Sequence, residues 1–134
     1  MKCKTLRRCL ELNEMKKIIV ALIIEKDGKF LVEKRDKLND DSPDKIVFPA
    51  GTVEEGESNE QTLRREMQEE LNIIISNPKL IHREDHHGLD IHWYTSDWTG
   101  EITNNENQEL LWTNNPEVLS FQSSKNALSK FLNR

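Results

Sequence analysis

The most informative part of this 134-residue chain is GTVEEGESNEQTLRREMQEELNI, which runs from Gly51 to Ile73. Within it, Ser58 is a good helix N-cap, and Gln61 three residues later completes a capping-box pattern. These two residues predict a helix from about Asn59 to Leu71. Asn72 follows directly, and asparagine readily adopts the left-handed conformation that ends many helices.

Three carboxylates of the predicted helix lie on one side of it. Glu66, Glu69 and Glu70 are spaced i, i+3 and i+4, so they fall within an arc of roughly 100°. The adjacent apolar stripe, which packs the helix against a core, consists of Leu63, Met67 and Leu71. Like charges at this spacing repel one another, whereas clustered carboxylates are suitable ligands for Mg²⁺ or Mn²⁺. The helix alone leaves two interpretations open, a metal site and a solvated acidic face.

The overall charge is acidic, with 19 Lys and Arg residues against 24 Asp and Glu residues and a net charge of -5. This balance argues against a protein that coats a nucleic-acid backbone. A phosphate substrate would need a cation as intermediary, and residues 51–70 alone contain seven glutamates against two arginines. The longest apolar run, Ile18 to Ile24, is much shorter than the ~20 residues of a membrane span. We therefore expect neither a nucleic-acid partner nor a membrane partner.

The N-terminal segment differs from the rest of the chain. Residues 1–14 are polar and form an extension, and one domain is expected over residues 15–134, a length typical of single domains. The two cysteines, Cys3 and Cys9, are too few and too closely placed for a disulfide-built secreted domain. No signal peptide is evident. A reducing, cytoplasmic location is therefore expected.

Strand patterns occupy most of the remaining sequence. Asp27-Gly28 is a strong hairpin signal between two of them, and Gly51 to Glu57 is expected to be an acidic loop. The expected strands cover residues 18–25, 29–35, 46–48, 73–75, 80–85, 89–98 and 110–112, and a closing helix covers residues 123–132. The pair at 73–75 and 80–85 is separated by an expected Asn77-Pro78 turn. Together these elements predict a mixed sheet with helices packed on it.

The spacing of the Gly51–Ile73 stretch resembles the Nudix box of the Nudix hydrolases. The matching positions are Gly51, Glu57, Arg65, Glu66, Met67, Glu69, Glu70 and Ile73. One position differs, because Asn72 stands where the family usually has glycine. The resemblance implies an α/β fold, the Nudix α/β/α sandwich with a mixed β-sheet, for residues 15–134.

The resemblance also implies roles for the box residues. Glu69 and Glu70 would be metal ligands, and Glu66 would be a ligand or the base that deprotonates water, which makes all three catalytic. The backbone carbonyl of Gly51 would add a further ligand. The metal would be Mg²⁺, with Mn²⁺ as the alternative. Glu57 and Arg65 would form a structural ion pair that ties the loop to the helix.

Two more site residues follow from the same resemblance. Members of the MutT-like subgroup have a distal glutamate six residues before a tryptophan, which favours Glu106 as a metal ligand here, with Glu109 as the alternative. Both precede Trp112. Arg35, at the end of an expected strand, resembles a substrate-binding arginine of the subgroup, and an exposed strand-end charge is the other interpretation.

The activity implied is hydrolysis of a nucleoside diphosphate linked to another group. The resemblance to the MutT-like subgroup favours a (d)NTP as the small-molecule substrate. Its hydrolysis would give the monophosphate and pyrophosphate. Phe121 to Lys125 replaces the Phe-Pro-Pro-Ala-Asn segment of that subgroup, which argues against specificity for 8-oxo-dGTP. ADP-ribose and dinucleoside polyphosphates are alternative substrates, and a non-catalytic nucleotide sensor is the alternative function. Nudix proteins are often dimers, so a homodimer is also considered.

Four histidines lie within eleven residues, at positions 82, 86, 87 and 92. His86 and His87 abut Gly88 at an expected hairpin turn, and adjacent strand residues point to opposite faces. A solvated turn is therefore favoured over a zinc site. His92 is a candidate for lining a substrate pocket. Core packing is the favoured role for Trp93 and its aromatic neighbours.

Overall fold

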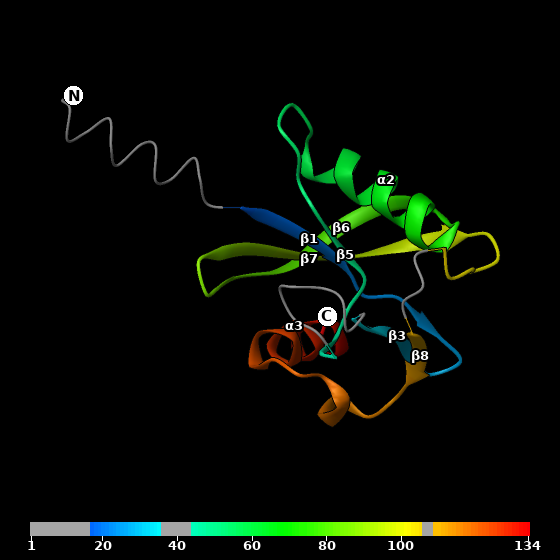
Figure 1. Cartoon of the computed structure of the whole chain (residues 1–134). Coiled ribbons are helices and arrows are strands. Elements are labelled where there is room, and N and C mark those ends of the chain that lie inside the picture. The colour runs from blue at the N-terminus through cyan, green and yellow to red at the C-terminus, as the bar shows by residue number, and fades with distance from the viewer. Residues whose placement is uncertain (1–16, 36–43, 106–108) are drawn as a thin grey trace.

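A computed structural model of the chain describes residues 17–35, 44–105 and 109–134. The predicted extension at residues 1–14, both cysteines and Glu106 lie outside the described residues. Figure 1 shows the helices α2 and α3 on opposite sides of a layer of strands. No helix within the described ranges is long and apolar enough to cross a membrane.

The described elements follow one another with short connections. In chain order they are β1 (Ile18–Leu22), β2 (Glu25–Lys26), β3 (Lys29–Lys34), β4 (Ile46–Val47), β5 (Ala50–Thr52), α2 (Asn59–Leu71), β6 (Ile74–His86), β7 (Leu89–Thr99), β8 (Glu109–Thr113), the 3₁₀ turn η1 (Pro116–Val118) and α3 (Gln122–Leu132).

The strands form two sheets. Sheet A has the order β5-β1-β7-β6; β1 and β7 are parallel and the other pairs are antiparallel, so this sheet is mixed. Sheet B is antiparallel and consists of β2, β3 and β4, with β8 paired to β3. The predicted α/β/α sandwich with a mixed sheet is confirmed, and the separate antiparallel sheet adds to it.

Strand β1 is the centre of the sandwich because its two faces are both buried. Val20 and Leu22 pack in one hydrophobic cluster with the apolar stripe of α2, whereas Ala21 packs in a second cluster with Leu128 and Phe131 of α3. Successive strand residues point to opposite faces of a sheet. The uninterrupted apolar run in this part of the sequence therefore supplies both cores at once.

The local predictions around α2 are confirmed. Ser58 Oγ accepts from the Gln61 backbone N–H, and the Gln61 side chain accepts from the Ser58 N–H, which completes the capping box. Asn72 adopts φ 61° at the C-cap, the left-handed conformation expected of it. The Asp27-Gly28 hairpin is also present, between β2 and β3.

Two strand predictions were wrong. Residues 50–52 are a strand rather than the start of a loop, because Ala50, Gly51 and Thr52 pair with β1; three residues are too few to show a period-2 pattern. The expected turn at Asn77-Pro78 is not a chain reversal. Instead β6 is one continuous strand with register shifts against β7 after Ser76 and after Leu80. Because β7 is long, β6 continues to pair with it beyond Pro78, and the proline lies in a β-bulge.

Candidate active site

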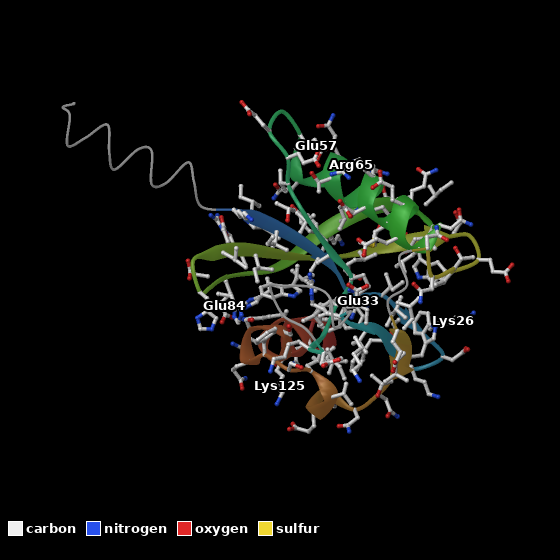
Figure 2. The ribbon with its side chains drawn as sticks, viewed as in Figure 1. Lys26, Glu33, Glu57, Arg65, Glu84 and Lys125 are labelled. Carbon is white, nitrogen blue, oxygen red and sulfur yellow. The ribbon has the colours of Figure 1, made fainter. Side chains whose placement is uncertain are left out.

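Arg65 lies at the centre of the acidic stretch and bonds both oxygens of Glu57. Its Nε donates to Glu57 Oε2 at 2.8 Å, and its Nη2 donates to Glu57 Oε1 at 3.0 Å. The Thr62 hydroxyl also donates to Glu57 Oε1, at 2.7 Å. Figure 2 shows Glu57 on the loop before α2 and Arg65 on the helix, with their side chains pointing toward one another. The pair joins the loop to the helix.

These hydrogen bonds shift the titration of both partners. The bond from Arg65 is the largest cause that lowers the pKa of Glu57 from 4.5 to about 2, and the Thr62 hydroxyl contributes next. The bond to Glu57 likewise raises the pKa of Arg65 above its ordinary value. Both groups are therefore charged throughout the neutral range.

The same guanidinium also contacts two of the predicted catalytic carboxylates. Arg65 Nη1 donates to Glu66 Oε1 at 2.9 Å and to Glu69 Oε1 at 3.2 Å. Because Arg65 is held on its other edge by Glu57, its contacts fix the orientation of the Glu66 carboxylate. The predicted ion pair and two of the predicted metal ligands, Glu66 and Glu69, thus form one continuous network.

Glu66 lies directly on the backbone of Gly51. A β-carbon built on Gly51 would overlap Glu66 Cγ and would lie 2.5 Å from Glu66 Cδ. Gly51 does not have a positive φ. Glycine is needed here for the close approach of the side chain from α2 rather than for an unusual backbone conformation.

The carboxylates of α2 differ in exposure. The Glu66 side chain is 18% exposed and that of Glu69 is 53% exposed, whereas Glu70 is a buried residue. Among residues 17–35, 44–105 and 109–134, no group of three or more His, Cys, Asp or Glu side chains is arranged to hold a metal ion. Arg65 Nη1 donates to one oxygen of Glu66 and to one oxygen of Glu69. The hard oxygen donors themselves suit Mg²⁺ or Mn²⁺.

The chain just before Glu106 packs against the C-terminal end of α2. Asn105 donates from its backbone N–H to the Glu70 carbonyl and from its side chain to the Glu69 carbonyl, both at 3.0 Å. These bonds satisfy two carbonyls of the last helical turn. Glu106 follows Asn105 directly, outside the described residues. Glu109, the alternative, begins β8 opposite Lys34 of β3.

A pocket of about 210 Å³ lies against the α3 side of sheet A. The residues that line it are Ile19, Ala21, Arg35, Val47, Phe48, Ala50, Gly51, Thr52, His86, Leu89, Ile91, Trp93, Phe121, Ser123 and Ser124. Predicted substrate residue Arg35 is among them, and its buried Nε has no hydrogen-bond acceptor within the described part of the chain. The pocket is mostly apolar with a few polar groups at its edge, as small-molecule sites commonly are.

A family model described as the NUDIX domain matches residues 15–131. The chain belongs to the Nudix family. It is 36% identical over 108 residues to a CTP pyrophosphohydrolase of Escherichia coli. The matched region covers 77% of this chain and 79% of that protein. It is 31% identical over 104 residues to an 8-oxo-dGTP diphosphatase of the same organism, over 73% of this chain and 81% of that protein.

Solved structures share the fold of this chain. The solution structure of the E. coli ORF135 protein has a TM-score of 0.65 at 32% identity and covers 90% of this chain and 92% of that chain. A MutT structure from a study of Aliivibrio salmonicida and Vibrio cholerae has a TM-score of 0.71 at 26% identity, over 87% and 95% of the two chains.

The histidine predictions for this Nudix protein are partly corrected. His87 and Gly88 form the β6–β7 turn as expected, with φ 51° and 85°. His86 is not simply solvated, because it lines the pocket beside Phe121. His92 does not line that pocket. Its Nδ1 lies 3.1 Å from the Asn59 side chain at the start of α2, on the opposite face of sheet A.

The serines at the start of α3 are pocket residues that sequence reasoning did not single out. Ser123 and Ser124 line the pocket together with His86 of the distant β6–β7 hairpin. The only sequence signal was the difference of this segment from the MutT-like pattern. Their contact with the hairpin depends on how α3 packs across sheet A.

Proposed function

We propose that this Nudix protein hydrolyses a nucleoside triphosphate to the monophosphate and pyrophosphate with a divalent cation. The observation that carries the proposal is the position of Gly51 on the edge strand β5. The Glu66 side chain of α2 lies on Gly51, and Gly51 also lines the pocket on the α3 side. A nucleotide with its base in the pocket could therefore extend its phosphates around this edge toward the carboxylates.

The lining of the pocket supports a base in this position. Phe48 and Trp93 give it buried aromatic walls, which suit the flat faces of a nucleobase. Arg35 supplies the positive charge of the lining, and its buried Nε has no acceptor among the described residues. We assign Arg35 to the sugar-phosphate part of the substrate, since a charged donor forms strong hydrogen bonds with phosphate oxygens.

Members of the family generally need a divalent metal ion. Glu69, Glu70 and the Gly51 carbonyl would hold it, with Glu66 as a further ligand or the base and Glu106 as the distal ligand. When bound, such an ion neutralises phosphate charge and lowers the pKa of a bound water. Water adds to one phosphorus of the α–β bridge, and the bridging oxygen leaves with the other phosphate. Glu66, oriented by Arg65, positions that water and accepts its proton.

The test is release of pyrophosphate from a nucleotide panel in the presence of Mg²⁺. CTP and 8-oxo-dGTP lead the panel because two relatives are named for them, and ADP-ribose and a dinucleoside polyphosphate represent the other substrate classes. Wild type is compared with Glu69→Gln and Glu70→Gln. The matched control is Glu60→Gln, which removes an exposed carboxylate from the first turn of the same helix.

We expect each active-site variant to lose at least about 100-fold in kcat, as when an electrostatic contact to the transition state is removed, and Glu60→Gln to keep its activity. Wild type that hydrolyses nothing in the panel would favour a nucleotide sensor. Turnover that survives both substitutions would overturn the metal assignment.

The remaining parts of the proposal concern the setting of the reaction. We assign Mg²⁺ as the metal, with Mn²⁺ as the alternative, and place the enzyme in the cytoplasm as a homodimer. Replacing Mg²⁺ with Mn²⁺ at equal concentration should lower kcat/KM. Sedimentation equilibrium of the full chain should give twice the mass of the monomer, and a monomer mass would refute the dimer.

A further inference from the structure

Thr62 is a fully buried polar residue near the start of α2. It is 0% exposed and lies one turn before Glu66, on the same side of the helix. A β-branched residue is less favourable than alanine inside a helix, and burying its hydroxyl costs free energy unless the group forms a hydrogen bond. Alanine would therefore suit this position better if the helix were the only requirement, and the hydroxyl needs a further explanation.

The partner of this hydroxyl is the carboxylate of Glu57. Thr62 Oγ1 donates to Glu57 Oε1 at 2.7 Å, while the Thr62 backbone N–H donates to the Ser58 carbonyl in the ordinary helical pattern. Inside helices, such hydroxyls often bond a carbonyl of the preceding turn, whereas this one reaches the loop before α2. A hydrogen bond to an ionised acceptor is stronger than one between neutral groups.

Three donors together fix the orientation of the Glu57 carboxylate. Arg65 Nε bonds Oε2, whereas Arg65 Nη2 and the Thr62 hydroxyl both bond Oε1. The guanidinium is planar and its donors are rigidly spaced, so the plane of the carboxylate sets the plane of the guanidinium. The remaining nitrogen, Nη1, donates to Glu66 Oε1 at 2.9 Å. A chain of hydrogen bonds thus runs from Thr62 through Glu57 and Arg65, the pair labelled in Figure 2, to Glu66.

We propose that Thr62 is a positioning residue for the hydrolysis: its hydroxyl holds the Glu57–Arg65 pair in the orientation that aligns Glu66 with the reacting water. The inference rests on the proposed function, in which Glu66 positions that water. It deepens that function by giving the ion pair a part in the rate, beyond joining the loop to the helix. Thr62 is not among the residues that line the pocket, so it acts only through these partners.

The test separates the hydroxyl from the rest of the side chain. Thr62→Ala and Thr62→Ser differ from each other only in the hydroxyl, and Thr62→Val keeps the branched shape without it. We expect kcat for pyrophosphate release with Mg²⁺ to fall about tenfold in the alanine and valine variants, the low end for a hydrogen bond to a charged group. Thr62→Ser should keep kcat within about threefold of wild type, because serine retains the donor. KM should stay unchanged in all three, since Thr62 is not in the pocket.

Stability should follow a different order from activity. Thr62→Ser leaves a cavity in place of a buried methyl group, and serine is a poorer helix former than alanine. The serine variant should therefore unfold at a lower urea concentration than wild type, although it is the most active of the three. The matched control is Thr113→Val at the end of β8, which removes a hydroxyl that accepts the Asn115 backbone N–H at 3.1 Å and should leave kcat unchanged.

Nuclear magnetic resonance gives readouts that do not depend on turnover. The Arg65 Nε proton, which is bonded to Glu57 Oε2, should exchange with solvent faster in Thr62→Ala than in Thr62→Ser, because the ion pair loosens without the hydroxyl. The bond from Thr62 is the second-largest cause, after Arg65, of the lowered pKa of Glu57. That pKa should therefore rise from about 2 toward 4.5 in Thr62→Ala and stay lower in Thr62→Ser.

The outcomes separate this inference from the proposed function. If wild type is active and the alanine and serine variants have kcat values within about twofold of each other, where about tenfold is expected, the inference is overturned and the enzyme assignment stands. A raised KM with unchanged kcat also overturns it. If wild type hydrolyses nothing, the proposed function fails, and hydrogen exchange decides the role of Thr62: faster exchange of the Arg65 proton in Thr62→Ala alone supports it, and equal exchange in both variants refutes it.

Discussion

Replacing Gly51 with alanine perturbs the carboxylate network at a single point. The new β-carbon would lie 2.5 Å from Glu66 Cδ, whereas non-bonded carbon atoms pack at about 3.5–4.0 Å. The Glu66 side chain must therefore move by about 1 Å or more, and this breaks its alignment with Arg65. The Gly51 backbone is not strained by the change, because its φ lies outside the positive region.

The expected cost falls on the reaction more than on the fold. A displacement of about 1 Å in a catalytic group lowers the rate by about 100-fold, so kcat for pyrophosphate release should fall by about that factor. Overpacking usually costs about 1–3 kcal/mol. The free energy of unfolding should fall by only about 1 kcal/mol, at the low end of that range, since the displaced carboxylate can turn toward solvent.

The control is Gly28→Ala in the β2–β3 hairpin, which should show the reverse effect. Gly28 has φ 77° with nothing within 4 Å of a built β-carbon, so alanine there costs about 1–2 kcal/mol in backbone strain and leaves kcat unchanged. Kinetics with Mg²⁺ and urea unfolding measure both quantities for both variants. A folded Gly51→Ala protein with kcat within about threefold of wild type would refute the reasoning, since about 100-fold is expected.

Two other predictions concern stability. Asn72→Gly should raise the free energy of unfolding by about 0.5–1 kcal/mol, because Asn72 occupies φ 61° and glycine adopts that region without steric cost. Urea titrations measure this quantity, and a free energy of unfolding below that of wild type would contradict the prediction. The lowered pKa of Glu57 means that its bond to Arg65 stabilises the fold fully above about pH 4.5, and that this stabilisation is lost as the pH falls toward 2. Glu57→Gln should therefore weaken the fall in melting temperature between pH 4.5 and 2, and an unchanged pH profile would exclude that role.

The acidic helix could be predicted because its signals are local. The Ser58–Gln61 capping box, the apolar stripe and the Asn72 cap all act within a few residues of one another, so their spacing alone implies helix α2 and the face on which its carboxylates lie. The same spacing led to the Nudix resemblance and through it to the sandwich fold. Hairpin signals such as Asp27-Gly28 were equally short in range.

The misjudged elements depend on pairing between distant segments. Strand β5 has three residues and no readable alternation, and it exists because β1 offers it hydrogen bonds. The Asn77-Pro78 pair favours a turn by composition, yet the β7 ladder continues past it. In both cases a partner strand outweighs local preference, as is common for β-structure.

The sequence by itself determined the family, the helix and the identity of its carboxylates, because residue type and spacing along one helix are sufficient for these. Only the tertiary structure decided that Glu66 lies on Gly51 and that the Arg65 guanidinium bonds three glutamates. It also decided that Ser124 of α3 and His86 of the β6–β7 hairpin line the same pocket. The physical reason is that such contacts join segments that are remote in sequence. Their distances are set by the packing of both helices on opposite faces of β1, which no local pattern encodes.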